Sequence, residues 1–264
     1  METFVARTDN FMTDDTKIGG PGSGQFPQTQ WSAIIAAGSD NQSERTRAFD
    51  VLVAAYWKPV YKYIRIKWNK SNEDAKDLTQ GFFTKAMEKD FFVGYDPAKA
   101  RFRTFLRTCL DGYIANEKKA SERLKRGGNT KPVSLDFESA DGELRQAELP
   151  DHEASLDDYF DKEWLRSLFG IAIEELQIVC EAKNKSVHFE IFRQYDLTAN
   201  EAGEKISYDM LSAQFDLPVT QITNYLAFTR REFRRIVLEK LREITINDDE
   251  FRSEARLVLG VTPE

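Results

Sequence analysis

The sequence contains few of the residues from which disulfide frameworks and metal sites are built. Its 264 residues include two cysteines, Cys109 and Cys180, and two histidines, His152 and His188. Two cysteines can form one bridge at most, and nothing in their setting indicates a disulfide framework. Neither histidine has a cysteine or a second histidine at the spacing that zinc sites use. We therefore expect no metal centre.

Long apolar runs and catalytic motifs are also missing. No apolar run approaches the ~20 residues that a bilayer-spanning helix needs. The N-terminus lacks the basic and then apolar order of a secretory signal. No phosphate-binding loop of the G-x-x-x-x-G-K type occurs. We expect a cytoplasmic protein that is not an enzyme, binds no cofactor and does not enter a membrane.

Charge is distributed unevenly along a chain whose formal net charge is -7. Residues 101–126 hold eight basic and three acidic side chains, and residues 230–242 hold six basic and two acidic ones. Between them, residues 136–163 hold eleven acidic and two basic side chains. Nucleic-acid binding depends on where the charge lies rather than on its total, so both basic blocks are candidate nucleic-acid surfaces.

Apolar residues recur at three- and four-residue spacing along most of the chain, which predicts an all-α protein. Pro59 is expected to kink or restart the helix that contains it. The predicted helices are 30–37, 43–68, 71–89, 102–125, 156–183, 187–195, 207–215, 219–244 and a short one within 247–264. The predicted organisation is a flexible tail (1–28), a helical domain (29–128), an acidic linker (129–155), a second helical domain (156–246) and a C-terminal tail (247–264).

Two predicted helices near the C-terminus have the spacing of a helix–turn–helix. Ser207 can cap the first helix, and Asp216-Leu217-Pro218 forms the turn before the second. At about 100° per residue, the second helix gathers its apolar residues in one sector. That sector contains Ile222, Leu226, Thr229, Phe233, Val237 and Ile244.

The opposite side of this helix carries short hydrogen-bonding residues first and arginines later. Short side chains allow close approach to base edges, and Asn or Thr can bond to them. Arginines further along can bind phosphates. The candidate DNA-contacting residues are Thr220, Thr223, Asn224, Arg230, Arg231 and Arg234. The alternative is a solvated face on which Arg and Glu form pairs four residues apart.

The first basic block interleaves aromatic and cationic residues. Aromatic rings can stack on unpaired bases while cations follow the nucleic-acid backbone. Phe102, Phe105, Leu106, Cys109 and Leu110 are expected to be mostly core residues. The candidate contact residues are Tyr113, Asn116, Lys118, Lys119 and Arg123.

Three segments together resemble a known family. They are EDAKDLTQGFFTKAMEK (73–89), FRTFLRTCLDGYIANEKKASERLKRGG (102–128) and LPVTQITNYLAFTRREFRRIVLEKLRE (217–243). In order and spacing they resemble bacterial RNA polymerase sigma factors of the extracytoplasmic-function type, within the sigma-70 family. The resemblance covers roughly 31–243, and DAKDLTQGFF is its most specific part. Ser212 and Asp216 stand where the family usually has Ala and Gly. Asp adopts a left-handed conformation more easily than most residues, so the turn is expected to survive.

The resemblance implies a promoter-specificity subunit whose partners are core RNA polymerase and promoter DNA. An anti-sigma factor or another regulator is a further candidate partner. The first domain would bind the polymerase clamp through Asp77, Leu78, Gln80 and Phe83. Its next helix would capture a melted base of the minus-ten element, and the helix–turn–helix would bind the minus-thirty-five element. The alternative is a stand-alone helix–turn–helix regulator whose N-terminal half is a protein-interaction module.

Overall fold

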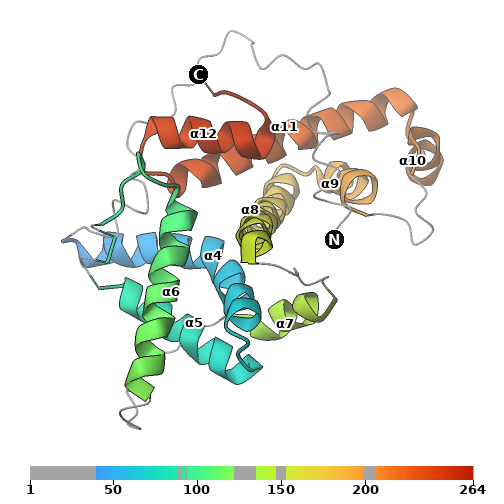
Figure 1. Cartoon of the computed structure of the whole chain (residues 1–264). Coiled ribbons are helices and arrows are strands. Elements are labelled where there is room, and N and C mark those ends of the chain that lie inside the picture. Colours follow the sequence, from blue (N-terminus) through green and yellow to red (C-terminus); the bar gives the residue numbers. More distant parts are fainter. Residues whose placement is uncertain are drawn as a thin grey trace. The chain divides into compact units, whose positions relative to one another are not determined.

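The computed structural model describes residues 40–88, 91–92, 94–121, 135–146, 153–198 and 206–263. These residues form nine α-helices and one π-helical turn, η1, and contain no strand, so the prediction of an all-α chain is confirmed (Figure 1). The predicted tail 1–28 and the predicted helix 30–37 lie outside the described residues. The helices are α4 (Gln42–Lys67), α5 (Asn72–Ala86), α6 (Phe102–Ser121), α7 (Phe137–Gln146), α8 (Glu153–Ala182), α9 (Ser186–Phe192), η1 (Arg193–Leu197), α10 (Tyr208–Phe215), α11 (Val219–Glu243) and α12 (Asp248–Leu259).

The described residues pack as two compact units. The N-terminal unit comprises residues up to Ser167 together with Glu243–Phe251, and the C-terminal unit comprises Leu168–Arg242 and the residues from Arg252 onward. The boundary at Ser167 lies inside α8, which contributes to both units. The predicted linker, 129–155, is helical over Phe137–Gln146 and again from Glu153. Whether the chain carries two sigma-like domains joined by that linker stays a prediction.

The N-terminal unit is built around α4. This helix continues through Pro59, where we expected a kink or restart, because buried side chains on both sides of the proline hold it in place. Val60, Tyr61 and Ile64 are fully buried. Ser71 caps α5 and accepts a hydrogen bond from the backbone N–H of Asp74 at 3.1 Å. Pro59 has no backbone N–H, but the loss of this one hydrogen-bond donor does not interrupt the helix around which the aromatic core packs.

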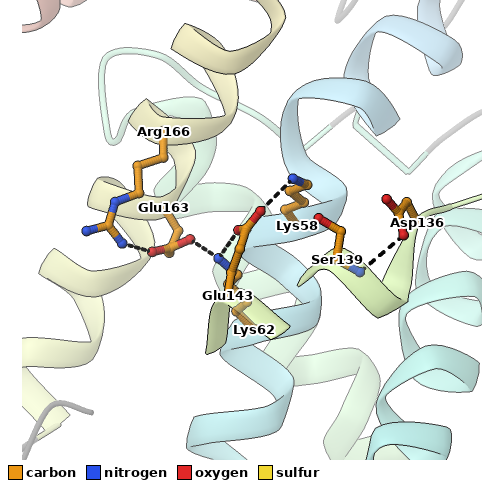
Figure 2. A network of polar contacts seen from close by, with 7 residues as sticks. All are labelled: Lys58, Lys62, Asp136, Ser139, Glu143, Glu163 and Arg166. Atoms are coloured by element: carbon orange, nitrogen blue, oxygen red, sulfur yellow. Dashed lines mark hydrogen bonds and ion pairs between the residues drawn. The ribbon is translucent and has the colours of Figure 1, made fainter. Parts of the chain in front are cut away.

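A buried ion-pair network holds α7 and the start of α8 against α4 (Figure 2). The Lys62 ammonium of α4 lies 2.6 Å from Glu143 of α7 and 2.6 Å from Glu163 of α8, and its side chain is 3% exposed. Glu143 also accepts a hydrogen bond from Lys58 at 3.0 Å, and Arg166 pairs with Glu163. The acidic segment thus belongs to the fold of this unit.

The C-terminal unit packs α8, α9 and α11 around aromatic residues. Phe169 of α8 contacts Phe233 of α11 edge to face, with ring centroids 5.5 Å apart. Phe192, at the end of α9, also contacts Phe233 at 5.9 Å. These three rings are at most 2% exposed. They anchor the middle of α11, whose N-terminal half extends toward the turn after α10 (Figure 1).

Candidate nucleic-acid interface

The turn between α10 and α11 has the geometry that its sequence predicts. Ser207 caps α10 and accepts a hydrogen bond from the backbone N–H of Met210 at 3.2 Å. Asp216 adopts the left-handed conformation, with φ 52° and ψ 47°. The Ser212 hydroxyl donates a hydrogen bond to the carbonyl oxygen of Leu217 at 2.6 Å, which closes the turn. α11 then begins at Val219, directly after Pro218.

The predicted core face of α11 is confirmed. Five residues of α11 on this face are at most 1% exposed, namely Ile222, Leu226, Thr229, Phe233 and Val237. The sixth predicted residue, Ile244, lies directly after α11 and is 3% exposed. On the opposite side Thr220, Asn224 and Arg231 are exposed, while Thr223 and Arg234 are half-buried. The Thr223 hydroxyl donates to the backbone oxygen of Thr220 at 3.0 Å. Short polar side chains therefore lead this exposed face, and a guanidinium group follows two turns later.

Arg230 differs from the other candidates because it faces inward. Its guanidinium donates two hydrogen bonds to the carboxylate of Asp196 in η1, at 3.1 and 3.0 Å, and the residue is 8% exposed. It also lies 5.5 Å from the ring centroid of Tyr195, which stacks on Tyr208 of α10. Burial acts to lower the pKa of Arg230, but Asp196 more than reverses this effect and raises it. Arg230 therefore fixes α11 against η1 and is not available to a phosphate in this conformation.

Arg235 forms the Arg–Glu pairs that we expect if this face of α11 is only a solvated surface. It pairs with Glu239, four residues later, at 2.6 Å, and with Glu232 at 3.4 Å. Such surface pairs stabilise a helix by a few tenths of a kcal/mol, about 0.3–0.5. Arg230 and Arg235 are thus both held by carboxylates of the chain itself.

A cationic and aromatic cluster, which sequence reasoning missed, borders the exposed face of α11. His188 of α9 stacks on Tyr225, with ring centroids 3.6 Å apart and planes 13° apart. It meets the ring of Phe228 edge to face at 5.6 Å. Burial, and then the nearby charge of Lys185, lower the pKa of His188 below its ordinary value. At neutral pH the imidazole is therefore an uncharged stacking partner that holds these two rings.

In the N-terminal unit, the predicted polymerase-binding residues lie on α5. Asp77 is exposed, Leu78 and Gln80 are half-buried, and Phe83 is 3% exposed. The Phe83 ring packs against Phe82 with centroids 5.5 Å apart. A partner protein can reach the first three side chains directly, whereas Phe83 supports α5 from beneath.

The predicted minus-ten residues lie on α6, which packs on α5 through Tyr113. The Tyr113 ring lies 5.8 Å from that of Phe82, and its hydroxyl occupies the space where a side chain at Gly81 would begin. Burial and the charge of Glu117 raise the pKa of Tyr113 to about 12. Asn116 and Lys118 are exposed. The side chain of Lys119 and the whole of Arg123 lie outside the described residues.

Comparisons with protein-family models, with curated proteins and with solved structures gave no match. Within the described part of the chain, no group of three or more His, Cys, Asp or Glu residues could hold a metal ion. Likewise, none of the described helices combines the length and apolar composition that crossing a membrane requires. The motifs of the chain and the geometry of α10, α11 and α5 are therefore the basis for a functional proposal.

Proposed function

We propose that this chain is a promoter-specificity subunit that resembles extracytoplasmic-function sigma factors and acts in the cytoplasm. It would bind core RNA polymerase through α5 and would recognise minus-ten and minus-thirty-five elements through α6 and α11. It would carry no catalytic group or cofactor of its own, because the chemistry belongs to the polymerase.

The observation that carries the proposal is the exposed face of α11 behind a tight left-handed turn. A second helix of this kind reads bases in the major groove when short polar side chains occupy its first turns. Thr220 and Asn224 have that position, and Arg231 can reach a phosphate beyond them. Of the other predicted contacts, Thr223 and Arg234 border the same face, whereas Arg230 is engaged with Asp196.

The features of α5 and α6 favour a polymerase subunit over a stand-alone regulator. A free-standing repressor or activator needs no second helix that combines exposed Asn116 and Lys118 with aromatic residues. Nor does it need the DAKDLTQGFF segment, whose Asp77 and Gln80 side chains are accessible on α5. An anti-sigma factor or similar regulator is a further partner that such a subunit would have.

Capture of the full-length chain by purified bacterial core RNA polymerase tests this proposal. We expect the wild-type chain to bind and Asp77→Ala/Gln80→Ala to bind at least tenfold more weakly, because both side chains are accessible on α5. The matched control is Lys85→Ala/Glu88→Ala, which removes an exposed ion pair from the end of the same helix. The control should bind like the wild type.

Two results would contradict the proposal. If the folded wild-type chain does not bind core polymerase, the stand-alone regulator becomes the better interpretation, and α11 would be tested on DNA alone. If both double variants lose binding equally, the contact does not depend on Asp77 and Gln80.

A further inference from the structure

Three cations converge on one aromatic ring at the edge of the exposed face of α11. The Lys185 ammonium lies 3.5 Å from the ring centroid of Phe228, and Lys183 and the Arg231 guanidinium each lie 5.8 Å away. Lys183 and Lys185 belong to the turn between α8 and α9, where Asn184 has a left-handed φ of 56°. We call these four residues, Lys183, Lys185, Phe228 and Arg231, the Phe228 cluster.

The turn that carries the two lysines is well defined by backbone hydrogen bonds. The backbone N–H of Lys185 donates to the carbonyl oxygen of Cys180 at 2.7 Å, and that of Asn184 donates to Glu181 at 3.0 Å. His188 and Tyr225 then hold the Phe228 ring from the side. The cations thus project from a hydrogen-bonded turn and from the helix itself, so the backbone that carries them is already ordered before binding.

The chain balances only part of this positive charge. Lys183 pairs with Glu232 at 3.0 Å. Neither Lys185 nor Arg231 forms an ion pair with any carboxylate among the described residues. The ring face attracts each cation by about 0.5–1 kcal/mol at an exposed site, which does not remove their mutual repulsion. A cluster with this excess charge is suited to an anion.

We propose that the Phe228 cluster is a second phosphate-binding surface, which binds the DNA backbone beside the bases that α11 contacts. Phe228 lies one helical turn after Asn224, and Arg231 belongs both to the cluster and to the exposed face. A duplex that meets Asn224 therefore brings a sugar–phosphate strand toward Lys185 and Lys183. This proposal rests on one part of the proposed function, which is that α11 binds DNA. It does not require that the chain binds polymerase.

The salt dependence of DNA binding tests the proposal with the full-length chain and a short duplex of random sequence. Each lysine that contacts a phosphate contributes about 0.9 to the slope of log K against log salt concentration. Lys183→Gln/Lys185→Gln should therefore reduce the slope by about 1.8. Between about 50 and 200 mM salt, wild-type affinity should then fall about 12-fold more than that of the variant.

A charge-matched control separates local contact from net charge. Lys162→Gln/Arg256→Gln removes two exposed positive charges elsewhere and should leave the slope at the wild-type value. Equal slopes for all three proteins would overturn the proposal, as would a wild-type chain that does not bind the duplex. If the lysine variant binds DNA normally but is captured less by core polymerase, the surface binds an acidic protein and the proposal is wrong.

The outcome is distinguishable from that of the proposed function. A reduced slope in a chain that fails to bind polymerase would support the Phe228 cluster and contradict the polymerase-subunit proposal. If the lysine variant has an unchanged slope and the chain binds polymerase through Asp77 and Gln80, the polymerase-subunit proposal is supported and the Phe228 cluster proposal is contradicted.

Discussion

Single residues decide the conformation of the turn between α10 and α11 and which arginines of α11 are accessible. Asp216 takes the left-handed conformation that glycine adopts at no steric cost. Arg230 and Arg231 are neighbours in sequence, yet one is buried against Asp196 and the other is exposed. The chemical identity of a side chain therefore does not by itself say what it contacts.

Substitution of Asp216 should report directly on the strain of the turn. We expect Asp216→Gly to leave the free energy of unfolding unchanged or slightly higher, because glycine adopts positive φ readily. Asp216→Val should lower it by about 2 kcal/mol, because a β-branched residue is a conformational outlier there. Equilibrium urea unfolding followed by circular dichroism measures both. Asp209→Val, in the exposed first turn of α10, is the control and should cost less than about 1 kcal/mol.

At the scale of elements, α7 shows that a segment with many acids can be part of a folded unit. Asp141 of α7 is 4% exposed and pairs with Arg65 of α4. Phe137 packs against Trp57 and Tyr61 with centroids 5.5 and 5.2 Å apart. Burial raises the pKa of Glu143, but Lys62 and Lys58 outweigh burial and bring it below its usual value. Glu143 is therefore an ionised partner of α4 at neutral pH.

The buried pair between Lys62 and Glu163 should be costly to break from one side. Their side chains are 3% and 2% exposed, so Glu163→Gln leaves a buried ammonium with one partner fewer. We expect the free energy of unfolding to fall by about 3 kcal/mol. Lys62→Met/Glu163→Met should lose less, because no buried charge is left uncompensated there. Urea unfolding monitored by tryptophan fluorescence reports on this unit, which contains Trp57 and Trp164.

Lys58 provides a matched control for this prediction. Its side chain is 31% exposed and pairs with Glu143, which also pairs with Lys62. We therefore expect Lys58→Met to lower the free energy of unfolding by less than about 1 kcal/mol. A loss for Glu163→Gln no greater than that for Lys58→Met would mean that water reaches the pair in solution.

For the whole molecule, the net charge of -7 conceals a local balance of charge. Arg103 and Arg107 of the first basic block pair with Asp161 and Asp157 of α8, at 2.9 and 2.7 Å. These acids belong to the acidic block 136–163 but lie after the predicted linker, 129–155. They neutralise part of the basic block within the N-terminal unit. The basic surface of α6 is therefore smaller than the sequence count suggests.

Buried tyrosines should limit the stability of the chain in alkali. Burial raises the pKa of Tyr63 to about 12, and burial together with Glu117 does the same for Tyr113. Their folded pKa values lie above the unfolded value of about 10, so the native state binds more protons between these values. The stabilisation is fully present below about pH 10 and is lost as the pH rises through about 12. Urea unfolding at a series of alkaline pH values measures this loss.

Tyr113→Phe isolates one contribution to the alkaline loss. The variant keeps the ring contact with Phe82 but cannot ionise, so its stability should fall less steeply than that of the wild type. Parallel curves for the two proteins would mean that Tyr113 titrates at its ordinary pKa in the folded state.

Most of the helices, the turn and the core face of α11 were predictable because they depend on local geometry, whereas α7 lies where a linker was expected. The positions of Ile222, Leu226 and Phe233 follow from the rotation of about 100° per residue, and the turn follows from Ser207 and Asp216. The inward orientation of Arg230 was not predictable, because its partner Asp196 lies 34 residues earlier in a π-helical turn. The Phe228 cluster was missed for the same reason, because Lys183 and Lys185 lie in the turn between α8 and α9 and are far in sequence from Phe228 of α11.

The sequence alone determined that this chain is helical, that a short turn joins two of its helices near residue 216 and that its charge occurs in blocks. Only the tertiary structure decided which charges meet each other and which remain exposed. Periodicity depends on neighbours within one helix, whereas an ion pair depends on segments that folding brings together. Lys62 and Glu163 are 101 residues apart, yet their charged atoms lie 2.6 Å apart.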